Sequence, residues 1–275
     1  MTHRPSAARL LRPFFLLFLT AFSLVPFWWM LVASLKSGDQ QLTSGNPWWF
    51  DEFYWGGYRD LLAGSLFRTW MLNTVLVLVS TVAISLVASC LAAYALAHLG
   101  VPHGRSLVLV LFATYLVPQG VLFLPLVRLL ARLHLLNSPA ALIVTYPGLV
   151  IPFGTWVLWS FFRSLPPDLV DLARLEGAGP VRTLTAVLLP MAAPSLAAVG
   201  LFAVAVVFND FLYAFTLIQS QQDTTLMGGV GLLSTDLGET GPTFAAVMLG
   251  ILPIALACAF FADRYAAGLG TGIID

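Results

Sequence analysis

The residue best suited to chemistry inside this chain is Asp210, which follows Asn209 in an otherwise apolar stretch. A charged side chain within a membrane is costly, and it usually faces the bundle interior or a water-filled cavity. We therefore expect Asn209 and Asp210, with the neighbouring Phe208 and Tyr213, to line a path through the protein or to bond another protein. The alternatives are that Asp210 reaches the outer membrane interface or pairs with a nearby helix of the same chain.

The sequence shows no set of residues that would carry out catalysis or hold a metal. No nucleophile, base and orienting acid occur together on a predicted pair of helices. The only lysine, Lys36, follows Leu35, whereas a phosphate-binding loop Gly-x-x-x-x-Gly-Lys-Ser/Thr needs glycine before the lysine. We expect no catalytic residue, no metal and no ATP hydrolysis by this chain itself. The histidines fall at separate predicted boundaries and cannot pair on one helix face: His3, His98, His103 and His134.

Composition places the chain in a membrane. Of its 275 residues, 59% are hydrophobic and 9% are charged, whereas soluble domains carry about 25% charged residues. Lysine plus arginine and aspartate plus glutamate number 13 each, so net charge gives no indication of a nucleic-acid partner. These values exclude a soluble enzyme, a disordered chain and a disulfide scaffold, and they predict a polytopic membrane protein in contact with lipid.

Uncharged runs predict an all-α protein with six transmembrane helices. A helix needs about 20 apolar residues to cross the hydrocarbon core. The run 183–209 is interrupted by Pro190 and Pro194, so we start the fifth helix near Ser195 and continue it through Asp210. The first run is longer than the apolar part of a signal peptide, so we expect a retained span. The predicted spans are about 13–35, 69–97, 106–127, 138–162, 195–220 and 242–263.

Charge bias predicts the orientation of this six-helix domain, residues 13–266. Cytoplasmic loops of membrane proteins carry an excess of Lys and Arg. An N-terminal tail, 1–12, that lies in the cytoplasm puts most of the basic residues inside. With six spans, the C-terminal tail, 267–275, is then cytoplasmic too.

The longest polar cytoplasmic segment, 164–190, is predicted to form a helix–turn–helix. Asp171 and Arg174 are an i,i+3 ion pair in its first helix. Residues 177–180 read Gly-Ala-Gly-Pro. Glycine can take the left-handed conformation that ends a helix, and proline suits the first turn of the next one. We expect Pro190 to end the second helix.

The second helix of this segment carries an apolar stripe. Helical connections are usually 2–8 residues long, so a capped helix pair of this length suggests more than a linker. A short exposed helix with an apolar face fits a groove on another protein. The alternative is a helical loop that rests on the lipid headgroups. The stripe consists of Val181, Leu184, Val187 and Leu188.

Segment 164–190 resembles the EAA loop of ABC importer permeases. That pattern reads Glu-Ala-Ala, three residues, Gly, nine residues, Ile, one residue, Leu-Pro. The chain matches it without a gap, from Asp171-Leu172-Ala173 through Gly177 to Val187-Leu188-Leu189-Pro190. Three residues differ from the pattern. Asp171, Leu172 and Val187 replace its Glu, Ala and Ile.

The resemblance covers roughly residues 10–270 and is closest to the second, shorter permease of maltose or glycerol-phosphate type sugar importers. The end of the chain, 270–275, has no lysine, whereas many relatives end in Gly-Ala-Val-Lys-Gly. The further matching motifs are Asn73-Thr74, Ala92-Ala93-Tyr94-Ala95, Pro118, Pro125, Leu135-Leu136-Asn137, Ile151-Pro152-Phe153, Leu165-Pro166, Glu176-Gly177-Ala178 and Phe208-Asn209-Asp210-Phe211.

The resemblance implies the type I ABC importer permease fold, in a prokaryotic cell membrane. A second homologous permease would complete the pore, and an external binding protein would deliver a sugar or sugar derivative. Two cytoplasmic ATPase subunits would bind ATP and magnesium, and a coupling helix from about Leu169 to Glu176 would transmit their movement. The residues implied in ATPase coupling are Asp171, Leu172, Ala173, Arg174, Glu176, Gly177, Ala178 and Pro190.

Three other functions remain open at this point. A six-span secondary transporter would need its own coupling-ion site, for which Asp210 is the one candidate. A membrane-embedded enzyme would need a catalytic set that the sequence lacks. Within ABC importers, the solute could also be an amino acid or a peptide, because the loop pattern is shared widely.

Overall fold

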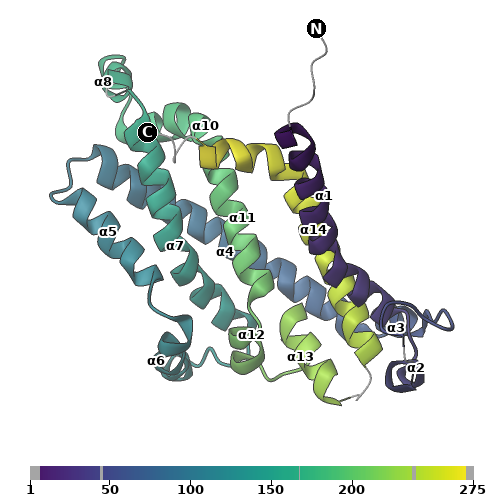
Figure 1. Ribbon diagram of the computed structural model, residues 1–275. Coiled ribbons are helices and arrows are strands. Elements are labelled where there is room, and N and C mark those ends of the chain that lie inside the picture. Colours follow the sequence, from purple (N-terminus) through teal and green to yellow (C-terminus); the bar gives the residue numbers. More distant parts are fainter. Residues whose placement is uncertain (1–6, 44–45, 167, 237–239, 271–275) are drawn as a thin grey trace, which may run out of the picture.

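The computed structural model describes residues 7–43, 46–166, 168–236 and 240–270, and all regular secondary structure in them is helical (Figure 1). This confirms the predicted all-α class. The centre of the bundle is formed by three long helices that contact one another. They are α4 (Ser65–His98), α7 (Pro139–Ser164) and α11 (Ala193–Asn209).

Helices α1 (Ala7–Ser34) and α14 (Thr240–Gly270) meet at one edge of the bundle, where the Trp29 ring contacts that of Phe244, and α5 (Gly104–Tyr115) packs on α7 at the other edge (Figure 1). Shorter helices connect these elements at both ends of the bundle. They are α2 (Gly38–Thr43), α3 (Gly56–Ala63), α6 (Gln119–Arg132), α8 (Asp168–Leu175), α9 (Pro180–Arg182), the π-helix η1 (Thr183–Leu188), α10 (Leu189–Met191), α12 (Leu212–Leu217) and α13 (Leu226–Asp236).

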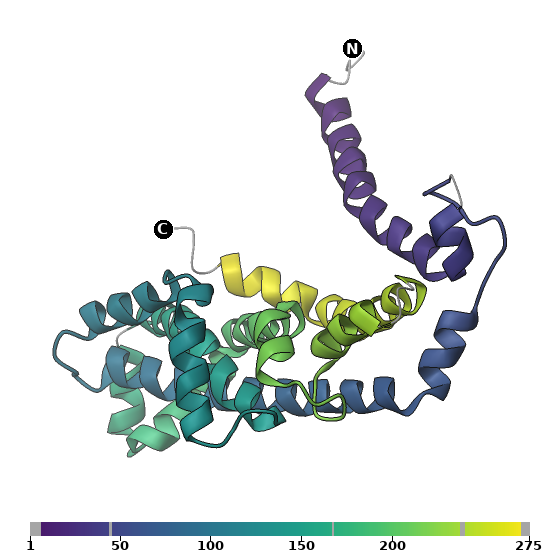
Figure 2. The same ribbon diagram turned by 90° about the horizontal axis from the view of Figure 1, so that it is seen from below.

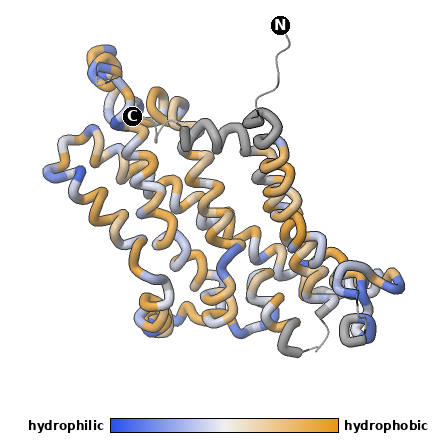
Figure 3. The backbone as a smooth tube through the Cα atoms, in the orientation of Figure 1, coloured by the Kyte–Doolittle hydropathy of each residue, from blue (hydrophilic) through white to orange (hydrophobic). Residues whose placement is uncertain are grey.

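Within the described residues, three helices are long and apolar enough to cross a membrane, namely Pro13–Ser34, Leu66–His98 and Pro139–Ser164. The number rises to five if each of two bent helix pairs counts as one span. In α14, the apolar part Gly241–Leu256 is shorter. The count of six spans therefore stays a prediction. Hydrophilic residues gather at helix ends and loops, and the middle of the bundle is hydrophobic (Figure 3).

Helix α1 is the most lipid-accessible of these spans. Figure 2 shows it leaning away from the rest of the bundle. Its large apolar side chains are exposed from Phe14 onward, and burial begins only near its end, at Val32. An apolar helix exposed on this scale is stable in a membrane and not in water, which agrees with the composition.

Small residues allow α4 and α7 to approach closely. Thr81, Ser85 and Ser89 of α4 are fully buried, and the Ser89 hydroxyl donates a hydrogen bond to the Ile151 carbonyl at 3.3 Å. A Cβ atom on Gly154 would lie only 2.6 Å from the Ser89 hydroxyl oxygen. Packing of small residues is the usual way for helices to associate in membranes, because lipid removes the hydrophobic driving force between them.

The predicted fifth span, a continuous helix over 195–220, is wrong. Helix α11 ends at Asn209, Asp210 is extended, and the chain starts again as α12 at Leu212. The physical reason is that the Asp210 carboxylate accepts hydrogen bonds from the first backbone N–H groups of α12, as capping side chains do.

Prolines bend two other predicted segments. The predicted span 106–127 is divided into α5 and α6, which meet at 93°, with Pro118 immediately before α6. Pro190 does not end its helix as predicted. It lies in α10, which continues η1 without a gap, and the bend of 80° follows at Ala192, two residues before Pro194.

One asparagine holds the loop that follows α12. The Asn137 side-chain oxygen accepts the N–H groups of Gln219 and Ser220, each at 2.8 Å. The Asn137 N–H donates to the Leu217 carbonyl, also at 2.8 Å. Asn137 has a positive φ of 63°, which asparagine tolerates better than most residues.

The next stretch of the same loop is held by α4. The Asn73 amide donates to the carbonyls of Gln222 and Thr224 at 2.9 and 3.0 Å, and the Thr74 hydroxyl accepts the Leu226 N–H at 2.8 Å. The motifs Asn73-Thr74 and Leu135-Leu136-Asn137 thus supply hydrogen bonds to the backbone between α12 and α13.

We expect Asn137→Ala to lower the free energy of unfolding by about 2 kcal/mol, because two backbone N–H groups lose their acceptor and alanine is strained at this positive φ. Unfolding by SDS in mixed micelles measures this value. Asn137→Asp keeps an acceptor oxygen and should lose less than half as much. Equal losses in both variants would contradict this role.

Candidate functional site

Helix α8 projects from one end of the bundle, and its base is anchored in the core (Figure 1). Val170 is the buried residue of α8, and it belongs to the same hydrophobic cluster as Leu184 and Leu188 of η1. The pair Asp171–Arg174 forms as predicted, with 3.3 Å between Nη1 and Oδ1. Arg174 also reaches the His98 carbonyl at the end of α4, at 3.4 Å.

The corner after α8 is built entirely from backbone hydrogen bonds. The Ala178 N–H donates to the Ala173 carbonyl and the Gly177 N–H to the Arg174 carbonyl, both at 2.9 Å. Gly177 has φ +81°, the left-handed conformation predicted from the sequence. This pair of bonds is the Schellman motif, which satisfies the last carbonyls of a helix.

The apolar stripe of the second helix does not face outward as predicted. Leu184 and Leu188 are buried in the chain's own core, because the helix lies against the bundle. Of the stripe, only Val181 is exposed, at 74%, and the other exposed apolar side chains at the corner are Leu172 and Leu175 of α8, at 58% and 85%. Sequence periodicity alone could not show which side of each helix the bundle would cover.

The predicted coupling residues gather mostly at this corner. Asp171, Leu172, Arg174, Glu176 and Gly177 are exposed. Ala173 and Ala178 are partly buried. Pro190 is exposed but lies further along the chain, in α10, outside α8 and its corner.

Asp210 holds the break between α11 and α12. Its Oδ2 accepts a hydrogen bond from the Tyr146 hydroxyl of α7 at 2.7 Å and from the Ala214 N–H at 3.2 Å. Its Oδ1 accepts the Tyr213 N–H at 3.3 Å. The carboxylate is therefore paired within its own chain, which was one of the alternatives for this residue.

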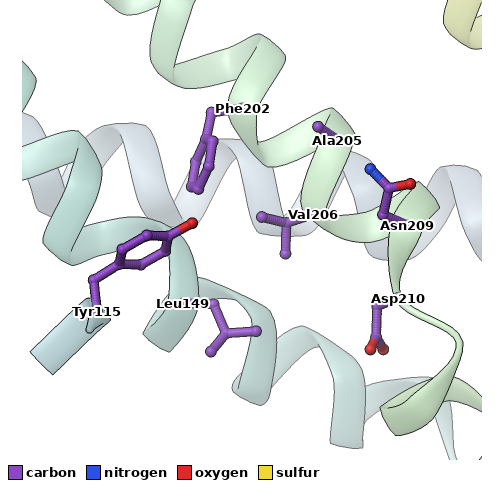
Figure 4. A pocket seen from close by; sticks show the side chains of 7 residues that line it. All are labelled: Tyr115, Leu149, Phe202, Ala205, Val206, Asn209 and Asp210. Carbon is purple, nitrogen blue, oxygen red and sulfur yellow. The ribbon is translucent and has the colours of Figure 1, made fainter. Parts of the chain in front are cut away.

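Asn209 and Asp210 also line a cavity of about 230 Å³ (Figure 4). Phe208 and Tyr213 do not line it, since they are 7% and 1% exposed and point into the core. Tyr213 borders a separate, mainly apolar cavity beside Leu126 and Leu149. The sequence therefore identified two of the cavity residues. The full lining is Tyr115, Leu149, Phe202, Ala205, Val206, Asn209 and Asp210.

Some of the cavity residues that we did not predict could have been recognised from their spacing in the sequence. Phe202, Val206 and Asn209 follow an i, i+4, i+7 spacing, which places them on one face of α11. Tyr115 comes from α5 and had no such signal. Within the described residues, no three His, Cys, Asp or Glu side chains lie close enough to hold a metal ion. The arrangement can bind and orient a molecule, and it shows no group placed to react with one.

The chain resembles transport proteins along most of its length. No family model matches it. It is 33% identical over 257 residues to the diacetylchitobiose uptake system permease protein NgcG of Streptomyces coelicolor, covering 90% of this chain and 83% of that protein. It is 31% identical over 251 residues to the sulfoquinovosyl glycerol transport system permease protein SmoH of Agrobacterium fabrum, covering 90% and 88%.

The fold is shared with a solved importer. A chain of a bacterial ABC transporter involved in the import of the acidic polysaccharide alginate superposes with a TM-score of 0.79 at 20% sequence identity. The match covers 96% of this chain and 99% of that one. This likeness shows the fold, and the two relatives show the class, a permease subunit of a transport system. The chain belongs to the permeases of binding-protein-dependent sugar ABC importers, which separates it from secondary transporters and membrane enzymes.

We expect Tyr146 and Asp210 to be energetically coupled. Tyr146→Phe and Asp210→Asn should each lower the free energy of unfolding, and the double variant should show a coupling of about 1–2 kcal/mol. SDS unfolding of the four proteins gives this value. Tyr115→Phe is the control and should change stability by less than about 0.5 kcal/mol. Additive losses would mean that the hydrogen bond contributes nothing.

Proposed function

We propose that this chain forms half of the pore of a sugar importer, with a second homologous permease forming the other half. It would cross the membrane six times, with α8 and both termini in the cytoplasm. The observation that carries this proposal is the exposed, capped α8 corner in a chain of this permease family. The named relatives that carry diacetylchitobiose and sulfoquinovosyl glycerol support a sugar or sugar derivative as solute.

In this proposal, two separate ATPase subunits bind ATP and magnesium, and this chain holds no cofactor. An external binding protein delivers the solute, as in the alginate importer solved with its periplasmic protein. Closure of the ATPase dimer would move α8. Because Val170, Leu184 and Leu188 anchor the segment in the core, that displacement would reach α7 and α11.

The ATPase contact would be made by the exposed apolar residues of the corner. Leu172 and Leu175 present apolar surface beside the paired charges of Asp171 and Arg174. An apolar patch with a polar rim is the usual composition of a protein interface. The resemblance of segment 164–190 to the EAA loop supports this role for Asp171, Leu172 and Arg174. Leu175 is added because its side chain is 85% exposed beside them.

We expect Leu175→Asp to weaken ATPase binding by about thirtyfold, because a charge would then be buried without a partner. Co-purification of the ATPase with the tagged permease tests this. Leu62→Asp is the matched control, since Leu62 is also exposed, at 63%, but lies in α3, at the other end of the bundle. Undiminished ATPase binding by Leu175→Asp would exclude the corner as the contact.

We expect Gly177→Trp to insert normally but to lose at least about tenfold in uptake while ATP hydrolysis continues. No atom lies within 4 Å of a Cβ at Gly177, so inside the chain the change meets only backbone strain of about 1–2 kcal/mol. Transport and hydrolysis by reconstituted vesicles measure the two rates.

Gly100→Trp is the matched control for this change. Gly100 has a φ of +67° and equally open surroundings, but it lies in the loop between α4 and α5. It should keep normal coupling. A normal uptake rate in Gly177→Trp would show that the corner does not transmit the movement.

A further inference from the structure

The cavity beside the end of α11 combines two aromatic rings with unpaired polar groups. The rings of Tyr115 and Phe202 have centroids 5.9 Å apart and are inclined at 63°. In Figure 4 the Tyr115 hydroxyl and the Asn209 amide flank Val206 from opposite sides. Side chains from α5 and α11, far apart in the sequence, thus meet around one hollow.

The polar groups of this cavity fall into two kinds. Both Asp210 oxygens accept hydrogen bonds from the protein, so they hold the backbone in place. Within the part of the chain that the structure describes, the Tyr115 hydroxyl and the Asn209 amide have no hydrogen-bond partner. Both residues are exposed, so these groups are available to a solute.

This combination matches the chemistry of an uncharged sugar. A pyranose ring has an apolar C–H face that packs against an aromatic ring, and hydroxyls around its edge that bond amide and phenol groups. The cavity, at about 230 Å³, is below the roughly 300–1,000 Å³ typical of drug-sized ligands. One sugar ring therefore fits better than an oligosaccharide.

The charge of the cavity lining narrows the class of sugar that can bind. No lysine or arginine lines the cavity, whereas the Asp210 carboxylate does. An acidic sugar would meet a like charge and no basic partner, which is a common way for a site to exclude a competitor.

We propose that this cavity is a subsite for one neutral pyranose ring of the transported solute. Phe202 gives the stacking face, Tyr115 and Asn209 bond the ring hydroxyls, and Asp210 disfavours carboxylated or sulfonated sugars. This inference rests on the proposed function and adds that this chain contacts the solute itself.

Calorimetric titration of the complete permease–ATPase complex in nanodiscs, without binding protein, tests the proposal. The neutral probes are maltose, trehalose and diacetylchitobiose, and the acidic probe is an alginate disaccharide. We expect at least one neutral sugar to bind more tightly than the acidic one. Phe202→Leu and Asn209→Ala should each weaken that binding by about tenfold or more, and Tyr115→Phe by several-fold.

Phe161→Leu is the matched control, because Phe161 is also partly buried but its ring contacts that of Phe162 and does not line the cavity. It should change affinity less than twofold. The subsite is overturned if Phe202→Leu and Asn209→Ala bind normally, if the control loses as much, if the acidic sugar binds as tightly, or if no neutral sugar binds.

Uptake by the wild-type complex separates this result from the proposed function. Vesicles that contain the complex and its binding protein should accumulate a sugar only with ATP. If they do so while the cavity variants bind normally, the subsite is wrong and the proposed function stands. If no sugar enters with ATP, the proposed function itself fails.

Discussion

Every backbone N–H and C=O that lies in hydrocarbon needs a partner inside the protein, and this requirement explains where the chain can leave its helices. Within α4 and α7 the helix satisfies its own backbone. Where α11 ends, the Asp210 carboxylate accepts hydrogen bonds from the first N–H groups of α12. In the following loop, Asn137 and Asn73 do the same for the backbone of 217–224. Asp210, Asn137 and Asn73 thus bond the backbone where the helices are interrupted.

The same requirement links the site to the fold. Asp210 must stay tied to Tyr146 and to α12, and this keeps the adjacent Asn209 at the rim of the cavity. The helix break therefore borders the hollow, and the residue that stabilises the break also gives the hollow its negative charge. A continuous helix over 195–220 would have satisfied its own backbone and would have needed no carboxylate at this point.

The sequence predicted features that depend on local chemistry. Apolar runs predicted the long helices. The Gly-Ala-Gly-Pro segment predicted the corner at Gly177, because glycine adopts the left-handed conformation more readily than other residues. It did not predict the break at Asp210, since one polar residue in an apolar run leaves the hydrophobic pattern unchanged. It also misplaced the outer face of the second loop helix, because only the folded bundle determines that Leu184 and Leu188 are covered. Tyr115 could not be assigned to the cavity, since α5 meets α11 only in three dimensions.

The corner after α8 has a consequence for how such subunits change over evolution. Its shape comes from one glycine and two bonds between main-chain atoms, so the exposed side chains of Leu172, Leu175 and Val181 contribute little to it. Those side chains can therefore change without loss of the bend. In the proposed contact with an ATPase, they would adapt to a different ATPase one substitution at a time, while the backbone of the corner keeps its geometry.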